Sequence, residues 1–410
     1  MRDGMYRACA PASITATRSS FVCLFRCYAS RYTVNMTVIE SRGLTGILRK
    51  TGSHREAVYE EGLRSARQDR YDVREYEAVP WVFKDGGERN VYKNFNLSVF
   101  VDELCNADCP FCVSLLRYEH KSLIYAKQKI SSDAEYEKRL YEVLEAIRPL
   151  NPSVSVTGGE PTILPRTYII AKALRELGFR KKTITSNGSG LFRPVGGHRE
   201  APIDALLEAG FDHLNISRAH WDDAENARIM RYKRTVSDTS LAHLARILSY
   251  LEGERLAPRI SCILLREGVG TVGTMKTYLD VLREVGARNF IFRELMDYDR
   301  NAVNLPMMRY MDENKVRLND LWGEIDDDAS FRRVLNILGY YYYVEVYRYR
   351  DCTVASESAD LSRQYTEKDD NPDMVYEMVL HENGNLCGSW IETEDILDRY
   401  DGYHDRGASR

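Results

Sequence analysis

The sequence predicts an α/β fold in which six β-α units build a parallel sheet. From the segment NFNLSVFVDEL onward, short apolar runs alternate with amphipathic stretches, as in successive β-α units. Several amphipathic stretches end in a glycine, which can take the left-handed conformation just beyond a helix. Such a sheet either closes into a barrel or stops as a partial barrel, and its ligands bind at the carboxyl ends of the strands.

The individual elements can be placed along the chain. We expect strands at residues 96–103, 153–159, 181–188, 212–218, 258–265 and 288–295. Helices are expected at 132–150, 166–178, 203–210 and 275–286. The strand interiors should be apolar, with polar residues at the strand ends. Arg293 and Glu294 are neighbours on one strand and cannot both face inward, so one of them is expected to be structural.

The chain is expected to hold a core with an extension on each side. Residues 94–300 form the core, 36–93 a polar N-terminal extension, and 301–410 a C-terminal α+β extension. The C-terminal extension is expected to contain a helical stretch near 307–325, a tyrosine-rich strand at 340–350 and a hairpin that turns at Asn383 and Gly384.

The first 35 residues stand apart in composition. Residues 1–35 contain five arginines and a single acid, Asp3. We interpret them as a disordered leader or as residues upstream of a true start at Met36. An organelle transit peptide is the alternative.

Composition limits the class of protein. The chain has 410 residues, of which 44% are hydrophobic, and it can bury a full-sized core. A net charge of -4 supplies no strong field for nucleic acid, so no nucleic-acid partner is expected. No run approaches the roughly 20 apolar residues that cross a bilayer, so no membrane partner is expected. Nine scattered cysteines fit a reducing compartment, which indicates a cytoplasmic protein.

Three cysteines stand close together in the segment LCNADCPFC: Cys105, Cys109 and Cys112. Thiolates at this density bind metal, form a disulfide or carry redox chemistry. Four sulfurs would close a structural zinc site, whereas three leave one coordination position open. A fourth local ligand is missing, because His120 lies eight residues on and Cys262 is in a distant strand. The set suggests a ligand from outside the protein, although a three-cysteine pattern by itself is also compatible with zinc.

In these residues the sequence resembles the radical S-adenosylmethionine (radical SAM) superfamily. The signature of that superfamily is three cysteines separated by three and then two residues, with an aromatic residue before the last cysteine. Phe111 supplies the aromatic residue, and the motif follows the first strand. The resemblance implies a partial (βα)6 TIM-like barrel in which the three cysteines hold a [4Fe-4S] cluster. The fourth iron would bind the amino and carboxylate groups of S-adenosylmethionine (SAM).

The second strand ends in TGGEP, where the superfamily has a Gly-Gly-Glu-Pro segment that binds the methionine amino group of SAM. The resemblance assigns this role to Gly158, Gly159, Glu160 and Pro161. Glycines permit close backbone approach to a ligand, and a carboxylate suits an ammonium partner. The alternative is a plain strand-to-helix turn with Glu160 near the start of the next helix.

Two further strand ends carry polar residues. Ser186 and Asn187 follow the third strand, and Ser217 and Arg218 follow the fourth; the resemblance makes all four candidate SAM-binding residues. The superfamily commonly uses a hydroxyl or charged group at the fourth position for the ribose or carboxylate of SAM, so the resemblance implies this role for Ser217 and Arg218. The alternative is that these residues cap helices.

The resemblance covers about residues 95–300. Some members carry auxiliary clusters in a C-terminal domain, but only Cys352 and Cys387 follow the barrel, too few to ligate one cluster unaided, so a single cluster is expected. Cys262 and Cys387 are candidate hydrogen-atom donors to a substrate radical. The alternative for Cys262 is a small buried hydrophobic residue.

By this resemblance the protein is expected to be an enzyme that cleaves SAM reductively and removes hydrogen from a substrate. A small metabolite of a biosynthetic pathway is favoured, because residues 36–93 show no clear strand-rich leader-binding module. A peptide-modifying enzyme is one alternative, and a non-catalytic protein with zinc or a relict cluster is another. An electron donor such as flavodoxin or ferredoxin is the implied protein partner.

Overall fold

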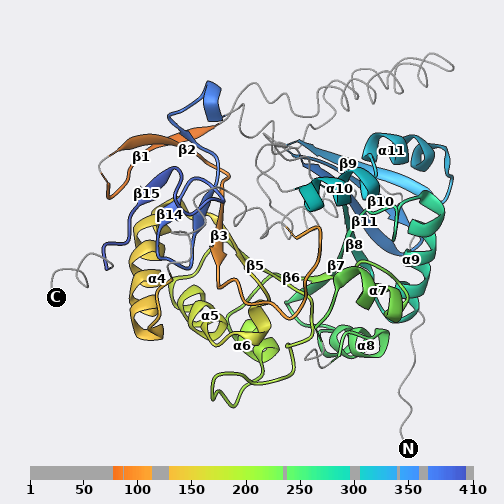
Figure 1. Ribbon diagram of the computed structural model, residues 1–410, viewed down its shortest axis with the longest axis horizontal. Coiled ribbons are helices and arrows are strands. Elements are labelled where there is room, and N and C mark those ends of the chain that lie inside the picture. The colour runs from red at the N-terminus through yellow and green to blue at the C-terminus, as the bar shows by residue number, and fades with distance from the viewer. Residues whose placement is uncertain are drawn as a thin grey trace, which may run out of the picture. The chain divides into compact units, whose positions relative to one another are not determined.

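The computed structural model describes residues 77–85, 87–112, 129–233, 238–295, 305–338, 342–359 and 368–402 (Figure 1). All of them lie within one compact unit, Thr37–Arg410. The predicted leader at 1–35, most of the predicted N-terminal extension and His120 lie outside the described residues. None of the helices in the described part has the length and apolar character needed to cross a bilayer.

Six parallel strands form the centre of a 12-stranded sheet. They are β3 (Asn96–Phe100), β4 (Ser153–Thr157), β5 (Lys181–Ser186), β6 (His213–Ser217), β7 (Ala257–Ile263) and β8 (Asn289–Arg293). They stand side by side in chain order, and each neighbouring pair is parallel. Each overlaps one of the six strands predicted from the sequence, so the prediction of an α/β fold is confirmed.

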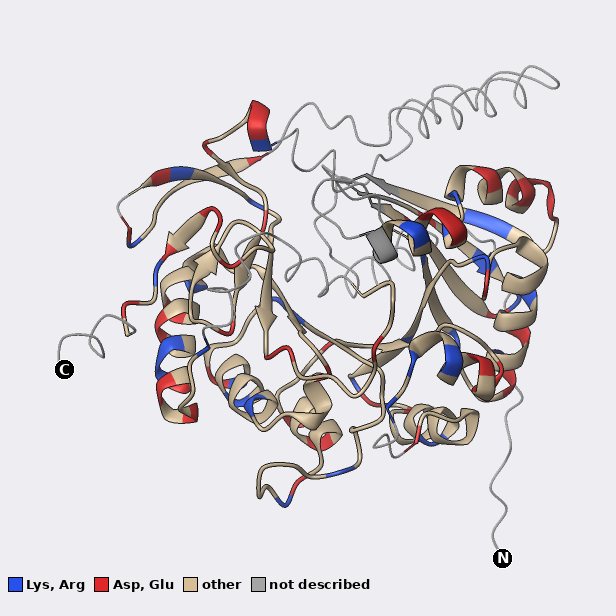
Figure 2. Ribbon diagram, in the orientation of Figure 1, with Lys and Arg blue, Asp and Glu red and all other residues tan. Residues whose placement is uncertain are grey.

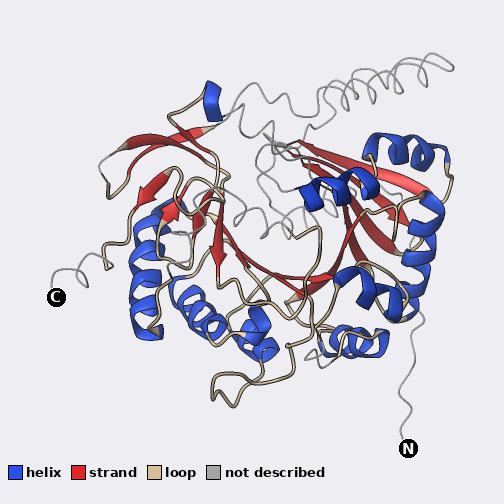
Figure 3. Cartoon of the chain, in the orientation of Figure 1, coloured by secondary structure: helices blue, strands red, loops and turns tan. Residues whose placement is uncertain are grey.

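Helices follow these strands and lie along one face of the curved sheet (Figure 3). They are α4 (Asp133–Ile147), α5 (Arg166–Leu177), α6 (Pro202–Glu208), α7 (Asp223–Met230), α8 (Leu241–Tyr250) and α9 (Val272–Glu284). Short 3-10 helices occupy Arg148–Leu150 and Pro161–Ile163. Charged residues of both signs are interspersed along α4 and α5, on the outside of the sheet (Figure 2).

Sequence reasoning predicted α4, α5, α6 and α9 but missed α7 and α8. Both missed helices begin at a capping residue: the Asp222 side chain accepts hydrogen bonds from the first-turn amides of α7, and the Ser240 side chain accepts one from the amide of His243. Asp and Ser are favoured N-cap residues, so the sequence did carry a signal for both helices.

The C-terminal part of the chain adds strands to both edges of the parallel sheet. β9 (Phe331–Leu338), β10 (Tyr342–Tyr349) and β11 (Cys352–Ala359) extend it beyond β8. β13 (Met378–Leu380), β14 (Leu386–Cys387) and β15 (Ile396–Asp398) extend it beyond β3. The sheet ends at β15 and β9 and does not close, so it is a partial barrel.

The remaining elements flank this sheet. The predicted helical stretch near 307–325 forms two helices, α10 (Leu305–Asn314) and α11 (Leu318–Asp327). β1 (Ala78–Val82), β2 (Glu88–Tyr92) and β12 (Met374–Val375) make a separate three-stranded sheet. The predicted hairpin is confirmed, because β13 pairs antiparallel with β14 and Gly384 between them has a φ of 87°. The tyrosine-rich segment forms strand β10, as predicted.

The two faces of the sheet differ in polarity. The face covered by helices, here called the outer face, is apolar, with Val154 and Ile184 fully buried. The opposite, inner face carries hydrogen-bonded polar side chains. The Ser155 hydroxyl donates to the side-chain oxygen of Asn96 at 3.0 Å and lies 3.1 Å from the Thr183 hydroxyl. The expectation of apolar strand interiors is therefore wrong for the inner face, because only the outer face is sealed by helices.

Alternation along β8 separates the two charged neighbours at its end. Phe290 and Phe292 contact Tyr278 of α9, with ring centroids 6.3 and 5.5 Å away, so they mark the outer face. Arg293 then lies on the inner face. Glu294 is structural, because its carboxylate accepts hydrogen bonds from the amide of Leu318, at 3.1 Å, and from the hydroxyl of Ser358.

Replacement of Phe290 by alanine should destabilise the protein by about 3–5 kcal/mol, because the ring is fully buried between β8 and α9. The free energy of unfolding from urea titration measures the effect. The control is Val82→Ala. Because Val82 is 67% exposed, this substitution should change the free energy of unfolding by about 0.5 kcal/mol or less. Equal effects of the two substitutions would contradict the assignment of the outer face.

Candidate functional site

The loop that follows β3 carries Cys105, Cys109 and Cys112, all of them half-buried. We call residues 101–112 the cysteine loop. On one side its backbone is bound by the end of β4, since the amides of Gly159 and Glu160 donate to the carbonyls of Asp102 (2.7 Å) and Leu104 (2.9 Å). The loop is thus held by backbone hydrogen bonds and not by regular secondary structure of its own.

The other side of the cysteine loop is bound by the segment after α7. The amide of Lys233 donates to the carbonyl of Asn106 (2.9 Å), and Ala107 forms an antiparallel bridge with Tyr232. The ammonium group of Lys233 also donates to the carbonyl of Cys105 (2.9 Å). Sequence reasoning missed this contact, because no local pattern in residues 230–233 indicates a partner 128 residues earlier.

Gly158 and Gly159 are required by the close approach of the cysteine loop. A Cβ atom on Gly159 would lie 2.1 Å from the carbonyl oxygen of Leu104, and one on Gly158 would lie 2.8 Å from that of Asp102. Gly158 also has a φ of 148°, which side chains rarely adopt. The close backbone approach in this structure is to the cysteine loop, whereas the approach expected from the sequence was to a ligand.

Glu160 is buried and collects hydrogen bonds from two strand ends. One carboxylate oxygen accepts from the amide of Thr162 (3.0 Å) and from the hydroxyl of Ser186 (2.6 Å), and the other accepts from the amide of Asn187 (2.6 Å). Burial raises the pKa of the carboxyl group, while these donors oppose the rise. Glu160 thereby fixes Ser186 and Asn187 at the end of β5, and Pro161 begins the short helix that follows.

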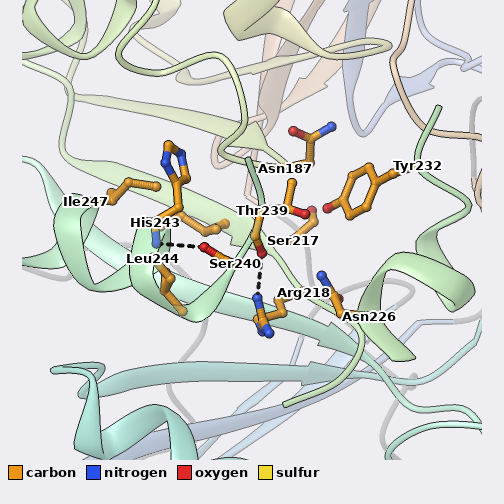
Figure 4. Close-up of a pocket in the computed structure, with 11 residues that line it drawn as sticks. Asn187, Ser217, Arg218, Asn226, Tyr232, Thr239, Ser240, His243, Leu244 and Ile247 are labelled. Carbon is orange, nitrogen blue, oxygen red and sulfur yellow. Dashed lines mark hydrogen bonds between the residues drawn. The ribbon is translucent and has the colours of Figure 1, made fainter. Parts of the chain in front are cut away.

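A pocket opens beside this network, at the carboxyl ends of β5 and β6 (Figure 4). Asn187, Ile216, Ser217 and Arg218 line it, as do residues of the α7 and α8 regions: Asn226, Tyr232, Thr239, Ser240, His243, Leu244 and Ile247. One hydrogen bond joins pocket and cysteine loop, because the side-chain amide of Asn187 donates to that of Asn106 at 2.7 Å.

Arg218 is 3% exposed and mainly braces the pocket wall. Its guanidinium donates to the carbonyls of Thr239 (2.9 Å) and Trp221 (3.2 Å) and to the carboxylate of Asp223 (2.6 Å). Its Nε is buried without a hydrogen-bond partner among the described residues. The side chain thus fixes the loop before α8.

Two thiols of the cysteine loop, those of Cys105 and Cys109, are destabilised as anions, mainly by burial. Burial raises the pKa of Cys105 to about 11, and the negative charges of Glu160 and Cys112 add to the rise. Burial also raises the pKa of Cys109 well above its ordinary value, with Cys112 and Cys105 contributing. A bound group of positive charge would offset this repulsion, so the loop suits an iron-bearing ligand.

In the part of the chain that the structure describes, no group of three or more His, Cys, Asp or Glu side chains is placed to hold one ion.

Two candidate hydrogen donors lie in the core. Cys262 is 1% exposed on the outer face of β7, where burial raises the pKa of its thiol, and it packs in the same apolar core as Tyr278. This placement favours the alternative interpretation of Cys262 as a small buried hydrophobic residue. Cys387 is fully buried in β14, with its sulfur 3.6 Å from the carbonyl of Glu392.

Replacement of Gly159 by alanine should release the cysteine loop, because the new Cβ would overlap the carbonyl of Leu104. In native, metal-free, reduced protein we expect iodoacetamide to alkylate Cys109 faster, on the order of tenfold or more, as measured by peptide mass spectrometry. Gly323→Ala is the matched control, since a Cβ there meets no atom within 4 Å. Unchanged alkylation in Gly159→Ala would show that the backbone contact does not hold the loop.

Comparison with known proteins adds an independent observation. Residues 101–253 match the family model of the radical SAM superfamily. The chain is 25% identical over 200 residues to a PqqA peptide cyclase from Methylorubrum populi, which covers 49% of this chain and 46% of that protein. It is 30% identical over 122 residues to a probable GTP 3',8-cyclase from Saccharolobus islandicus, which covers 30% of this chain and 34% of that protein. The chain thus spans at most about half the length of these curated relatives.

Solved structures show a more distant similarity. Streptococcus suis SuiB bound to S-adenosylmethionine has a TM-score of 0.43 and 13% identity, covering 83% of this chain and 65% of that chain. The family match at 101–253 spans the three cysteines, the glycine-glutamate segment and the residues that line the pocket. Residues 101–253 are thus identified as similar to the radical SAM superfamily domain.

Proposed function

We propose that the protein is a radical SAM enzyme in which Cys105, Cys109 and Cys112 hold a [4Fe-4S] cluster and the adjoining pocket receives SAM. When bound and reduced, this pair of cofactors supplies a 5'-deoxyadenosyl radical that removes hydrogen from a substrate. The observation that carries the proposal is the hydrogen bond between Asn106 and Asn187, which places the pocket directly beside the cysteine loop.

The residues of the chain position and shield these groups. Glu160 orders Ser186 and Asn187. Its second carboxylate oxygen accepts a hydrogen bond from the amide of Asn187 and can accept another from the ammonium group of SAM. Ser217 and the Nε of Arg218 supply polar contacts for the ribose or carboxylate. Leu244 and Ile247 give the pocket an apolar wall for the flat face of the adenine.

A small polar metabolite is the proposed substrate. The inner face of the sheet, which the reactive group would overlook, presents hydroxyl and amide groups, such as Asn215, whose side chain accepts a bond from Arg259 at 2.9 Å. A substrate rich in hydrogen-bonding groups matches this lining. A peptide is the second candidate, and the similarity to a PqqA peptide cyclase over 200 residues favours it.

An electron donor such as flavodoxin or ferredoxin is the proposed protein partner. Leu104 is 56% exposed directly beside Cys105, so the cysteine loop has a surface that a donor can approach. Electron transfer to a buried cluster requires such a short path through the protein.

Anaerobic reconstitution of the Cys109→Ala variant should yield no cluster, because two remaining thiolates cannot retain it. Wild-type protein should turn brown, absorb broadly near 400 nm and form 5'-deoxyadenosine with SAM and reductant. Cys352→Ala, which alters a buried cysteine outside the loop, should behave as the wild type. A colourless wild-type protein that binds zinc instead would exclude the proposed function and favour the non-catalytic alternative.

The Glu160→Ala variant should keep the cluster and bind SAM about 10- to 100-fold more weakly, because Ser186 and Asn187 lose their common anchor. Cluster content is read from iron analysis and absorbance, and SAM affinity from equilibrium dialysis. Unaltered SAM affinity would remove Glu160 from the proposed site.

The two substrate classes can be separated by size. Reconstituted protein is mixed with SAM, reductant and either the small-molecule or the peptide fraction of an extract from the source organism. Formation of 5'-deoxyadenosine above the level without extract should occur with the small-molecule fraction. Stimulation by the peptide fraction alone would select the second candidate.

A further inference from the structure

Arg293 occupies the inner face of the sheet at the carboxyl end of β8, the same end as the cysteine loop. Its backbone pairs with Ile263 of β7. Ile263 in turn packs against an apolar cluster that Cys109 and Phe111 also contact. Side chains at paired positions of neighbouring parallel strands point to the same side of a sheet. Arg293 therefore lies beside a residue that packs against the same cluster as the cysteine loop.

The partner of Arg293 is Glu357, from the neighbouring strand β11. The two residues are in register, and an Nη of Arg293 lies 3.8 Å from a carboxylate oxygen of Glu357. Their side chains are 38% and 22% exposed. This distance is longer than a charge-assisted hydrogen bond, which joins such atoms within about 3 Å. The ion pair is therefore loose and open to a competitor.

The Nε of Arg293 adds a second sign of unused binding capacity. This atom is buried and has no hydrogen-bond partner among the described residues. An arginine whose Nε and Nη both face one ligand can bind two oxygens of a carboxylate or phosphate side by side. Glu294, the next residue, contrasts with it, because both of its carboxylate oxygens are engaged.

We propose that Arg293 binds an anionic group of the substrate, a carboxylate or a phosphate, and that this group displaces Glu357. The identity of the ligand as the substrate rests on the proposed radical SAM function, whereas anion binding itself does not. In the free protein Glu357 keeps the guanidinium in place. On binding, two substrate oxygens take the Nε and Nη of Arg293, which fixes one end of the substrate beside the cysteine loop.

The test uses succinate and pyrophosphate as probes on reconstituted full-length protein with SAM present. Isothermal titration calorimetry at constant ionic strength measures their affinity. Wild-type protein should bind at least one probe, and Arg293→Gln should bind it at least tenfold more weakly. Arg288→Gln is the matched control, because Arg288 lies before the start of β8 and pairs with Asp351. Binding of succinate alone indicates a carboxylate, and binding of pyrophosphate alone indicates a phosphate.

The Glu357→Gln variant should change probe affinity in the opposite direction. Because the substitution removes the competing carboxylate, this variant should bind the same probe several-fold more tightly than the wild type. If the ion pair were purely structural, its loss would not tighten probe binding. Affinity for SAM should be equal in wild type and Arg293→Gln, which separates this anion site from the carboxylate of SAM.

The proposal is overturned if wild-type protein binds neither probe, or if Arg293→Gln binds as the wild type does. These outcomes leave cluster formation and SAM cleavage unaffected. Failure of the proposed function appears separately, as a protein that forms no cluster or no 5'-deoxyadenosine while it still binds anions through Arg293.

Discussion

The backbone contact between the cysteine loop and the end of β4 is the constraint on which the site depends. Two amides, from Gly159 and Glu160, donate to two carbonyls of the loop. These bonds join main-chain groups at a separation that no Cβ atom would permit, so the position demands glycine. Residues 101–112 have little regular structure, and backbone groups of a loop that are buried must find partners elsewhere. Their partners at β4 and after α7 give three thiols a fixed position.

Glu160 extends this contact into a network that reaches the third strand. Its burial would be costly for a carboxylate without donors, and Thr162, Ser186 and Asn187 supply them. Asn187 then bonds Asn106 within the cysteine loop. The ends of β3, β4 and β5 are thereby tied to one another, and a rigid support of this kind is what a reactive site needs to keep its cofactors aligned.

The incomplete closure of the sheet explains the contrast between its two faces. Helices α4 to α9 cover the outer face, which must therefore be apolar. The inner face is left for side chains and ligands, and it carries serine, threonine, asparagine and arginine. The C-terminal strands enlarge this face at both edges, and β11 brings Glu357 beside Arg293. Residues far apart in the chain thus lie on one face of the sheet.

The sequence by itself determined the six strands, the hairpin at Gly384 and the spacing of Cys105, Cys109 and Cys112, because each depends on neighbours in the chain: alternation, turn chemistry and loop length. The tertiary structure alone decided that Gly159 receives the cysteine loop, that Lys233 binds it from the other side, and that the inner face is polar. These features depend on contacts between segments that are distant in sequence. Local patterns carry no record of such contacts, since packing is fixed only when the sheet assembles.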